Sequence, residues 1–240
     1  MLPTYREYRP PAGLAPVAAC LWEQRPAADR VQRIVPDGCV DLIWMAEHAL
    51  VIAGADTGPR SVELPAGVRS SGIRLRPGAA GAVLGLPAFE IRDCQVDVAL
   101  VWDRESVRLR EALALAAPAQ RLGLLADAIA RRNGQPDVLV VEAARRLATP
   151  GARVAAVAAG LGVSERQLHR RTLAAVGYGP KMLARVARLR RLVTLSGEHS
   201  LGARAVDAGF ANQAHMSAEV LRLTGATPVR FLKDAMLTAA

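Results

Sequence analysis

The sequence predicts an α+β protein with two parts. The N-terminal part is expected to be a β-containing domain, a half-barrel or cupin-like sheet with helices, and the C-terminal part an all-α domain of two helix-turn-helix units joined by a helix. Short apolar segments separated by Gly and Pro recur about every ten residues between Arg33 and Leu75. From Pro118 onwards the apolar positions follow a helical period. A turn glycine, a corner residue and a helix cap occur twice, with the glycines at Gly162 and Gly209.

Length and composition agree with two globular domains, which we place at 1–132 and 137–240. Of the 240 residues 51% are hydrophobic and 22% are charged, which is enough apolar material for a core. Aromatic residues make up only 4%, so Ala, Leu and Val must dominate that core, which favours helices. No uncharged apolar run reaches about 18 residues, and the N-terminus is charged where a signal peptide is apolar. We therefore expect a cytoplasmic protein that does not contact a membrane.

Four strands are predicted in the N-terminal half. The turn residues Pro36-Asp37-Gly38 separate the first strand from the second. In the last strand Ile73 and Leu75 alternate with Arg74 and Arg76, the period of a half-buried strand. The predicted strands are Val31–Val35, Cys39–Met45, Ala49–Ala53 and Val68–Leu75.

Helices are predicted to follow these strands, at Ala79–Leu84, Glu105–Ala116 and Pro118–Arg132. Proline suits the first position of a helix because its missing N–H has no partner there. The sequence Asn133-Gly134-Gln135-Pro136 stops the third helix and is a predicted linker between the domains. A further helix is predicted to begin at Asp137 and to end before Pro150-Gly151.

The N-terminal half shows no catalytic motif. Cys39 lies between Asp37 and Asp41, and nearby acids raise the pKa of a thiol, so a buried core cysteine is the favoured interpretation. Three separated cysteines (Cys20, Cys39 and Cys94) and four dispersed histidines indicate neither disulfides nor a metal site. We predict no enzyme, no cofactor and no metal. A covalent thiol sensor or an enzyme in this half remains the alternative.

Positive charge is concentrated in the C-terminal half. Residues 137–240 contain 15 Lys and Arg against 7 Asp and Glu, a net charge of +8. Residues 1–136 contain 16 against 15, a net charge of +1. A basic module beside a nearly neutral one is typical of a nucleic-acid-binding protein with a separate regulatory part.

Val154–Leu173 fits a helix-turn-helix unit. Gly162 occupies the turn, where a left-handed backbone disfavours residues with a Cβ atom. Ser164 is expected to cap the second helix, and Leu168 to anchor it. The residues left facing outward are Arg166, Gln167, His169 and Arg170. Arg pairs with guanine and Gln with adenine in the major groove, so this face is a candidate DNA-reading surface, although a solvated helix face is the simpler alternative.

A second unit repeats the pattern. Ser200 is expected to cap its first helix, Gly209 to form the turn, Phe210 to fill the corner and Asn212 to cap the second helix. The candidate contacts on that second helix are Gln213 and Ser217.

One helix is predicted between the units, from Pro180 to Thr194. Its length is about 22 Å, which brings the two reading helices to roughly the 34 Å of one DNA turn. Lys181, Arg185 and Arg188 lie along it at near-helical spacing. They are candidate phosphate contacts, and a solvated basic face is the alternative.

The C-terminal half resembles the DNA-binding domain of the AraC/XylS family of transcription regulators. The resemblance rests on Gly209-Phe210, Gly225-Ala226-Thr227-Pro228, Phe231 and Gly177-Tyr178-Gly179-Pro180. It implies base-reading positions at Arg166, His169 and Arg170 in the first unit. In the second unit the implied positions are Gln213, Ala214, Ser217 and Ala218.

Four residues depart from the family pattern. Ala218 replaces a usual Arg, Arg204 replaces an apolar residue, and Thr172 and Val220 replace aromatic anchors. These departures leave the first unit as the stronger reader. The N-terminal half is similar to an uncharacterised domain found ahead of such DNA-binding domains, and family members commonly use that half to sense an effector or to dimerise.

The sequence therefore predicts a sequence-specific transcription regulator that binds double-stranded DNA. Its N-terminal domain is expected to sense a small-molecule effector or to mediate homodimerisation. Besides the thiol sensor or enzyme, one alternative remains: a helix-turn-helix interaction protein that no longer reads DNA.

Overall fold

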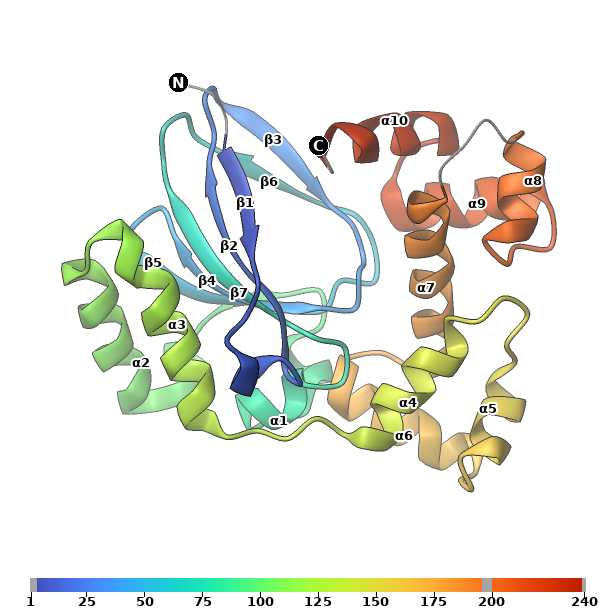
Figure 1. The fold of residues 1–240 in the computed structure, drawn as a ribbon, viewed down its shortest axis with the longest axis horizontal. Helices are drawn as coiled ribbons and strands as arrows, with labels where there is room; N and C mark the ends of the chain where they lie inside the picture. The colour runs from blue at the N-terminus through green and yellow to red at the C-terminus, as the bar shows by residue number, and fades with distance from the viewer. Residues whose placement is uncertain (1–3, 196–199, 239–240) are drawn as a thin grey trace.

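The computed structural model describes residues 4–195 and 200–238 and shows an antiparallel sheet followed by helices, which confirms the predicted fold class (Figure 1). Within the described residues one sheet has six strands in the order β1-β2-β7-β4-β5-β8, and every pairing is antiparallel. The strands are β1 Thr4–Tyr8, β2 Ala18–Arg25, β4 Val40–Met45, β5 Ala49–Ala53, β7 Ser70–Leu75 and β8 Gln95–Asp97. A separate ribbon pairs β3 (Arg30–Ile34) with β6 (Arg60–Leu64).

The central strands bury both faces of the sheet. Side chains alternate between the faces of a strand, so Leu42 and Trp44 face one way and Ile43 the other. The first face packs under the helices in one core cluster with Leu50, Ile52, Ile73 and Leu75. The second face forms a smaller cluster of Cys20, Trp22, Ile43, Val51 and Ala53.

Helices α2 (Ala99–Leu115) and α3 (Pro118–Arg132) lie beside the sheet, and α1 (Ala80–Leu84) lies near its end (Figure 1). The helix predicted from Glu105 begins six residues earlier, with non-helical backbone at Trp102 and Asp103. Trp102 is 3% exposed, and its indole N–H donates to the Leu84 carbonyl at 3.3 Å. Anchoring of this one aromatic residue against α1 therefore accounts for the additional, kinked turn.

Seven helices complete the described part of the chain. They are α4 Val138–Leu147, α5 Val154–Gly160, α6 Glu165–Val176, α7 Pro180–Thr194, α8 Leu201–Asp207, α9 Gln213–Thr224 and α10 Pro228–Thr238. Helices α5 and α6 form the first helix-turn-helix unit, α8 and α9 form the second, and α7 lies between them (Figure 1). The bounds of α7 are those predicted from the sequence.

The first unit packs directly on the N-terminal part of the chain. Leu168 of α6 belongs to the same core cluster as the sheet residues Trp44 and Ile73. The second unit has its own cluster, which includes Leu189, Phe210 and Met216. The linker is also packed, because a Cβ atom at Gly134 would lie 2.7 Å from the backbone of Ala82 in α1. The first unit is therefore fixed to the N-terminal sheet, while the second is held mainly through α7.

No helix in the described ranges is long and apolar enough to cross a lipid bilayer. The same residues contain no group of three or more His, Cys, Asp and Glu side chains placed to hold a metal ion.

Candidate nucleic-acid interface

The turn of the first unit is built around Gly162 and Ser164. Gly162 has φ of 69°, a left-handed conformation that suits glycine. The Ser164 hydroxyl accepts the Gln167 backbone N–H at 3.2 Å, and the Gln167 side-chain oxygen accepts the Ser164 N–H at 2.9 Å. This capping box satisfies two free donors of α6 and occupies the side chain of Gln167, which the sequence proposed for base contact. Leu168, 0% exposed, anchors the helix from below.

The outer face of α6 presents Arg166, His169 and Arg170. All three residues are exposed. His169 lies against the start of α7, because a Cβ atom at Gly179 would come within 2.7 Å of its Nε2. Arg166 and Arg170 form no ion pair with any described residue, so both guanidinium groups are available to a partner outside the chain.

The second unit repeats this local geometry. The Ser200 hydroxyl accepts the Ala203 N–H at 3.2 Å at the start of α8. Gly209 has φ of 90°, and the Asn212 side-chain oxygen accepts the His215 N–H at 2.8 Å at the start of α9. Of the candidate contacts on α9, Gln213 is exposed and Ser217 is half-buried.

Phe210 fills the corner of the second unit and is 4% exposed. The His215 ring meets it edge-on with the ring centroids 5.6 Å apart. The Arg188 guanidinium lies over its face at 5.6 Å from the ring centre. Arg188 is half-buried and its guanidinium packs on the corner rather than extending from α7, and this burial lowers its pKa.

The three predicted phosphate contacts of α7 therefore lie in different environments. Lys181 is exposed and has no ion-pair partner among the described residues. Arg185 lies beside α9, with its Nε 3.1 Å from Glu219 Oε2, and this pair neutralises its charge within the protein. Arg188 is covered by Phe210. The sequence could not distinguish them, because Glu219 and Phe210 lie far along the chain from α7.

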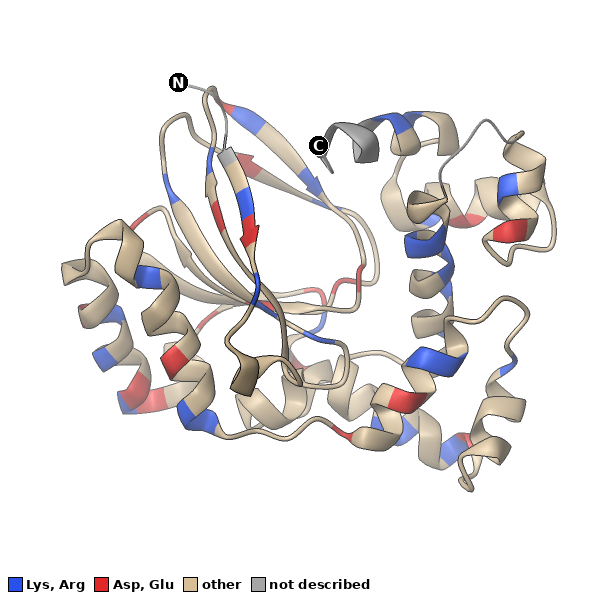
Figure 2. Cartoon of the chain, in the orientation of Figure 1, with Lys and Arg blue, Asp and Glu red and all other residues tan. Residues whose placement is uncertain are grey.

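Lys and Arg lie along α4, α6 and α7 (Figure 2), and several of these cations pair with other groups of the chain. Arg145 and Arg146 both pair with Glu142 at 2.7 Å. The cations without an ion pair or side-chain hydrogen bond in the described ranges are Arg153, Arg166, Arg170, Lys181, Arg190, Arg222 and Lys233. Two of these seven lie on the outer face of α6.

The structure accommodates the departures from the family pattern. The Arg204 guanidinium donates to the carbonyl of Leu195, which follows the last turn of α7, where a cation is favourable. Thr172 is completely buried, and its hydroxyl donates to the Leu168 carbonyl at 2.8 Å. Val220 is also completely buried. Arg204, Thr172 and Val220 thus each have a local partner or lie in the core, whereas Ala218 is exposed on α9.

Asp137 connects the linker to the reading helix. Its Oδ1 accepts the N–H groups of Leu139 and Val140, which caps α4. Both of its oxygens accept from the Arg171 guanidinium on α6, at 2.7 and 2.8 Å. Burial opposes ionisation of Asp137, but the Arg171 and Val140 hydrogen bonds outweigh it and hold its pKa below the ordinary value.

Removing Asp137 is expected to destabilise the junction. Asp137→Ala loses the cap and the ion pair and should lower the free energy of unfolding by about 1–2 kcal/mol, whereas Asp137→Asn keeps a capping oxygen and loses less. Because the folded pKa lies below the unfolded one, the ionic contribution is present above the ordinary value of 3.8 and is lost as the pH falls through the folded pKa. Urea unfolding across this pH range measures both effects. An Asp137→Ala variant as stable as the wild type at pH 7 would contradict both roles.

Cys39 and Cys20 do not show the features of a reactive thiol. Burial, and then the neighbouring Asp37, raise the pKa of Cys39 well above its ordinary value. Burial raises the pKa of Cys20 to about 11. A reactive thiol needs a lowered pKa and access to solvent, so neither residue supports a thiol sensor. Cys94 is exposed.

The family comparison assigns the helical half. Residues 157–234, which include both units and α7, match the family model described as "Helix-turn-helix domain". This segment is an AraC-type DNA-binding domain. The match confirms the prediction of a DNA-binding transcription regulator. Residues 6–97, which carry all the strands except β1's first two residues, match "Domain of unknown function (DUF6597)".

The chain was also compared with curated proteins and with solved structures. A comparison with curated proteins found no similar sequence. A solved structure of ToxT from Vibrio cholerae (P21 form) is 11% identical, with a TM-score of 0.47, covering 95% of this chain and 97% of that one. ToxT from Vibrio cholerae O395 is 10% identical, with a TM-score of 0.46 and coverage of 88% and 95%. Unsaturated fatty acid-bound wild-type ToxT is 12% identical, with a TM-score of 0.44 and coverage of 90% and 94%.

Proposed function

We propose that the AraC-type domain recognises specific double-stranded DNA through α6 and α9, and that the N-terminal domain controls this binding in response to a small-molecule effector or through homodimerisation. Recognition takes place in the cytoplasm. The two domains are assigned to residues 1–132 and 137–240, with the packed segment 133–136 between them.

The observation that carries this proposal is the pair of unpaired guanidinium groups on the outer face of α6. Arg166 and Arg170 are exposed, one helical turn apart, while Arg185 and Arg188 are held within the fold. An arginine can bind guanine through two hydrogen bonds in the major groove. His169 lies beside them on the same face. The first unit is thus the principal reader.

The second unit contributes less to base reading in this proposal. Gln213 and Ser217 supply its polar contacts, and Ala214 and Ala218 offer only apolar ones. Lys181 is assigned to phosphate, where a cation supplies affinity without sequence preference. Since α7 spans 15 residues, or about 22 Å, the two units are spaced for successive major grooves on one face of the duplex.

Control by the N-terminal domain is supported by its shared core with the first unit. A Cβ atom at Gly81 of α1 would lie 2.5 Å from the Ala174 carbonyl of α6. At the end of α6, a Cβ atom at Gly177 would lie 3.2 Å from the Ala88 carbonyl. A displacement of α1 therefore also moves α6, because close-packed elements in direct contact transmit displacements to one another.

Arg170→Ala tests the proposal in the full-length chain. We expect the dissociation constant for DNA from upstream of the gene to rise about 5- to 150-fold, the effect of about 1–3 kcal/mol for one base contact. Binding to a shuffled duplex should weaken much less. The matched control is Arg104→Ala, which removes an exposed arginine from α2, far from both units (Figure 1).

Fluorescence anisotropy over a salt series measures these affinities. A steep loss of affinity with salt, together with a sequence preference that Arg170→Ala removes, supports the regulator. Equal losses in Arg170→Ala and Arg104→Ala would contradict direct reading by α6. A folded chain that binds neither duplex at low salt would favour a protein-interaction role for the helix-turn-helix units.

A further inference from the structure

The two reading helices, α6 and α9, correspond position by position. Each follows a capping residue, Ser164 in the first unit and Asn212 in the second. Four residues after its cap, each helix buries one apolar side chain completely, Leu168 in α6 and Met216 in α9. Because cap and buried residue have the same spacing, residues at equal distances from the two caps occupy equivalent places on the two helices.

The two positions that carry exposed arginines in α6 carry alanines in α9. Arg166 and Arg170 lie two and six residues after their cap. The same positions in the second unit hold Ala214 and Ala218, and both are exposed. Leu221, one turn after Ala218, is 53% exposed, although leucine is usually buried. The outer face of α9 is therefore apolar where that of α6 is cationic.

Packing behind α9 fixes which of its sides faces outward. Met216 and Val220 belong to the core cluster of the second unit. Glu219 is 9% exposed, and its Oε2 lies 3.1 Å from Nε of Arg185 on α7. These residues occupy the side of the helix opposite Ala218, so α9 cannot turn its alanines inward without breaking the ion pair and the core. The alanines are therefore presented to a partner outside the chain.

The polar residues beside the alanines suit the groove of a DNA duplex. Gln213 is exposed, and its side chain forms no hydrogen bond with any described residue. A glutamine can bind adenine, the partner of thymine, through two hydrogen bonds. Arg222, one turn after Ala218, is exposed and has no ion-pair partner in the part of the chain that the structure describes, which leaves it for a phosphate group. An amide at one end of the face and a cation at the other complement base edges and the anionic backbone.

We infer that Ala214 and Ala218 read thymine, through van der Waals contact of their methyl groups with the C5 methyl groups of the bases in the major groove. Thymine alone among the four bases presents a methyl group there, and apolar side chains such as alanine recognise it. The contact needs a close approach of α9 to the base edges, which short side chains permit. This assignment rests on the proposed function and gives the class of DNA: guanine opposite α6, and A·T pairs opposite α9.

A DNA site of this kind has no two-fold symmetry. Palindromic sites reflect two identical readers, whereas α6 and α9 present different chemistry on one chain. The guanine-containing part and the thymine-containing part are expected roughly one turn of the duplex apart, since α7 separates the two units.

The test starts from duplexes that the full-length protein selects from a random pool. The part of the selected sequence whose contribution Arg170→Ala removes is the part bound by α6, and the other part should contain thymine. Replacing one of these thymines by uracil, which lacks only the C5 methyl group, should raise the dissociation constant about three- to fivefold. Uracil should have no effect in the part bound by α6. There, 7-deazaguanine, which lacks the N7 acceptor, should weaken binding instead.

Two variants of one alanine connect the effect to α9. In Ala218→Gly, replacement of the corresponding thymine by uracil should no longer change the dissociation constant. Both duplexes are compared on the same variant, so any loss of helix stability cancels. Ala218→Arg gives α9 the cation that α6 carries at Arg170, and it should change the preferred base at that position from thymine to guanine.

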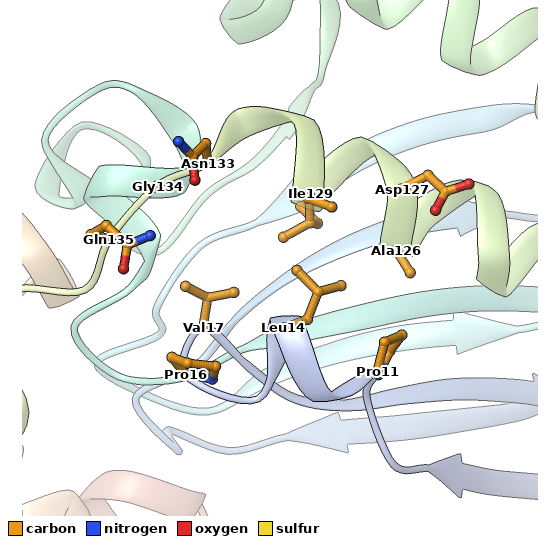
Figure 3. Close-up of a pocket in the computed structure, with 12 residues that line it drawn as sticks. Pro11, Leu14, Pro16, Val17, Ala126, Asp127, Ile129, Asn133, Gly134 and Gln135 are labelled. Carbon is orange, nitrogen blue, oxygen red and sulfur yellow. The ribbon is translucent and has the colours of Figure 1, made fainter.

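The matched control adds the same cation far from the second unit. Ala130 of α3 is exposed and lines a cavity of about 250 Å³ between α3 and the segment around η1 (Ala12–Leu14) (Figure 3). No residue of either helix-turn-helix unit lines this cavity, and α3 lies on the other side of the molecule from α9 (Figure 1). Ala130→Arg should therefore leave the preferred bases unchanged.

Each contrary result has a distinct meaning. A preference for thymine that survives replacement by uracil would overturn the inference alone, because the preference would then come from the shape of the duplex. Guanine in both parts would also overturn it. A selected sequence confined to the part bound by α6, with no DNA protected by the second unit, would assign α9 to another partner. A protein that selects no sequence would overturn the proposed function together with the inference.

Discussion

Phe210→Ala is expected to unfold or loosen the second helix-turn-helix unit while the first stays folded. Truncating a buried phenylalanine costs about 3–5 kcal/mol through lost burial and the cavity left behind. Here it also removes the partner of the Arg188 guanidinium and of the His215 ring. The cluster around Phe210 is separate from the one that contains Leu168, so the loss should stay local.

Hydrogen exchange and footprinting on DNA measure this separation. Amides of α8 and α9 should lose protection while those of α6 keep theirs, and the protected DNA should shrink to the part contacted by the first unit. Phe89→Ala is the matched control, because Phe89 is 42% exposed and its truncation should cost less than about 1 kcal/mol. Simultaneous loss of protection in both units would show that they unfold together and would contradict the two-cluster arrangement.

Local sequence patterns predicted the elements whose stability is local. The helix Pro180–Thr194 and the strand Ala49–Ala53 have the predicted bounds, because a proline or an apolar run marks their ends. The predicted caps depend on residues at most three positions apart, such as Asn212 and His215. Patterns that involve only neighbouring residues can be recognised in the sequence before the tertiary structure is known.

The strands that the sequence analysis does not predict are β1, β2, β6 and β8. All of β1's described side chains are exposed, so its sequence carries no alternation of apolar and polar residues. β2 did carry a signal, an apolar segment from Val17 to Trp22 bounded by Pro16 and Pro26. Both of its faces are covered, by the helices and by the smaller cluster, as are those of the predicted strands β4 and β5, so the sequence contains the same signal for β2 as for them.

The functional assignment of cations was the least predictable part. At the sequence level Arg166 and Arg185 look equivalent, since each is an arginine on a helix of a basic domain. Arg185 is neutralised by Glu219, 34 residues further along, and only the packing of α7 against α9 brings the two together.

Gly54→Ala is expected to destabilise the N-terminal domain by about 3 kcal/mol or more. A Cβ atom at this position would lie 1.8 Å from the Ile91 carbonyl oxygen, which is backbone and cannot rotate away. The Gly54 N–H donates to the Cys94 carbonyl at 2.9 Å, so the two segments cannot separate without losing that bond. The matched control is Gly58→Ala, where nothing lies within 4 Å of the added atom.

The effect of Gly54→Ala should also reach the DNA-binding surface. The next residue, Ala55, would lie 3.5 Å from a Cβ atom at Gly177, where α6 ends. Displacing this segment weakens its packing against the end of α6. DNA affinity should therefore fall together with the free energy of unfolding. Urea unfolding and anisotropy on both variants measure the two quantities. If Gly54→Ala lowers stability but leaves DNA affinity equal to that of Gly58→Ala, the first unit does not depend on the N-terminal domain for its position, and control of α6 through the shared core is excluded.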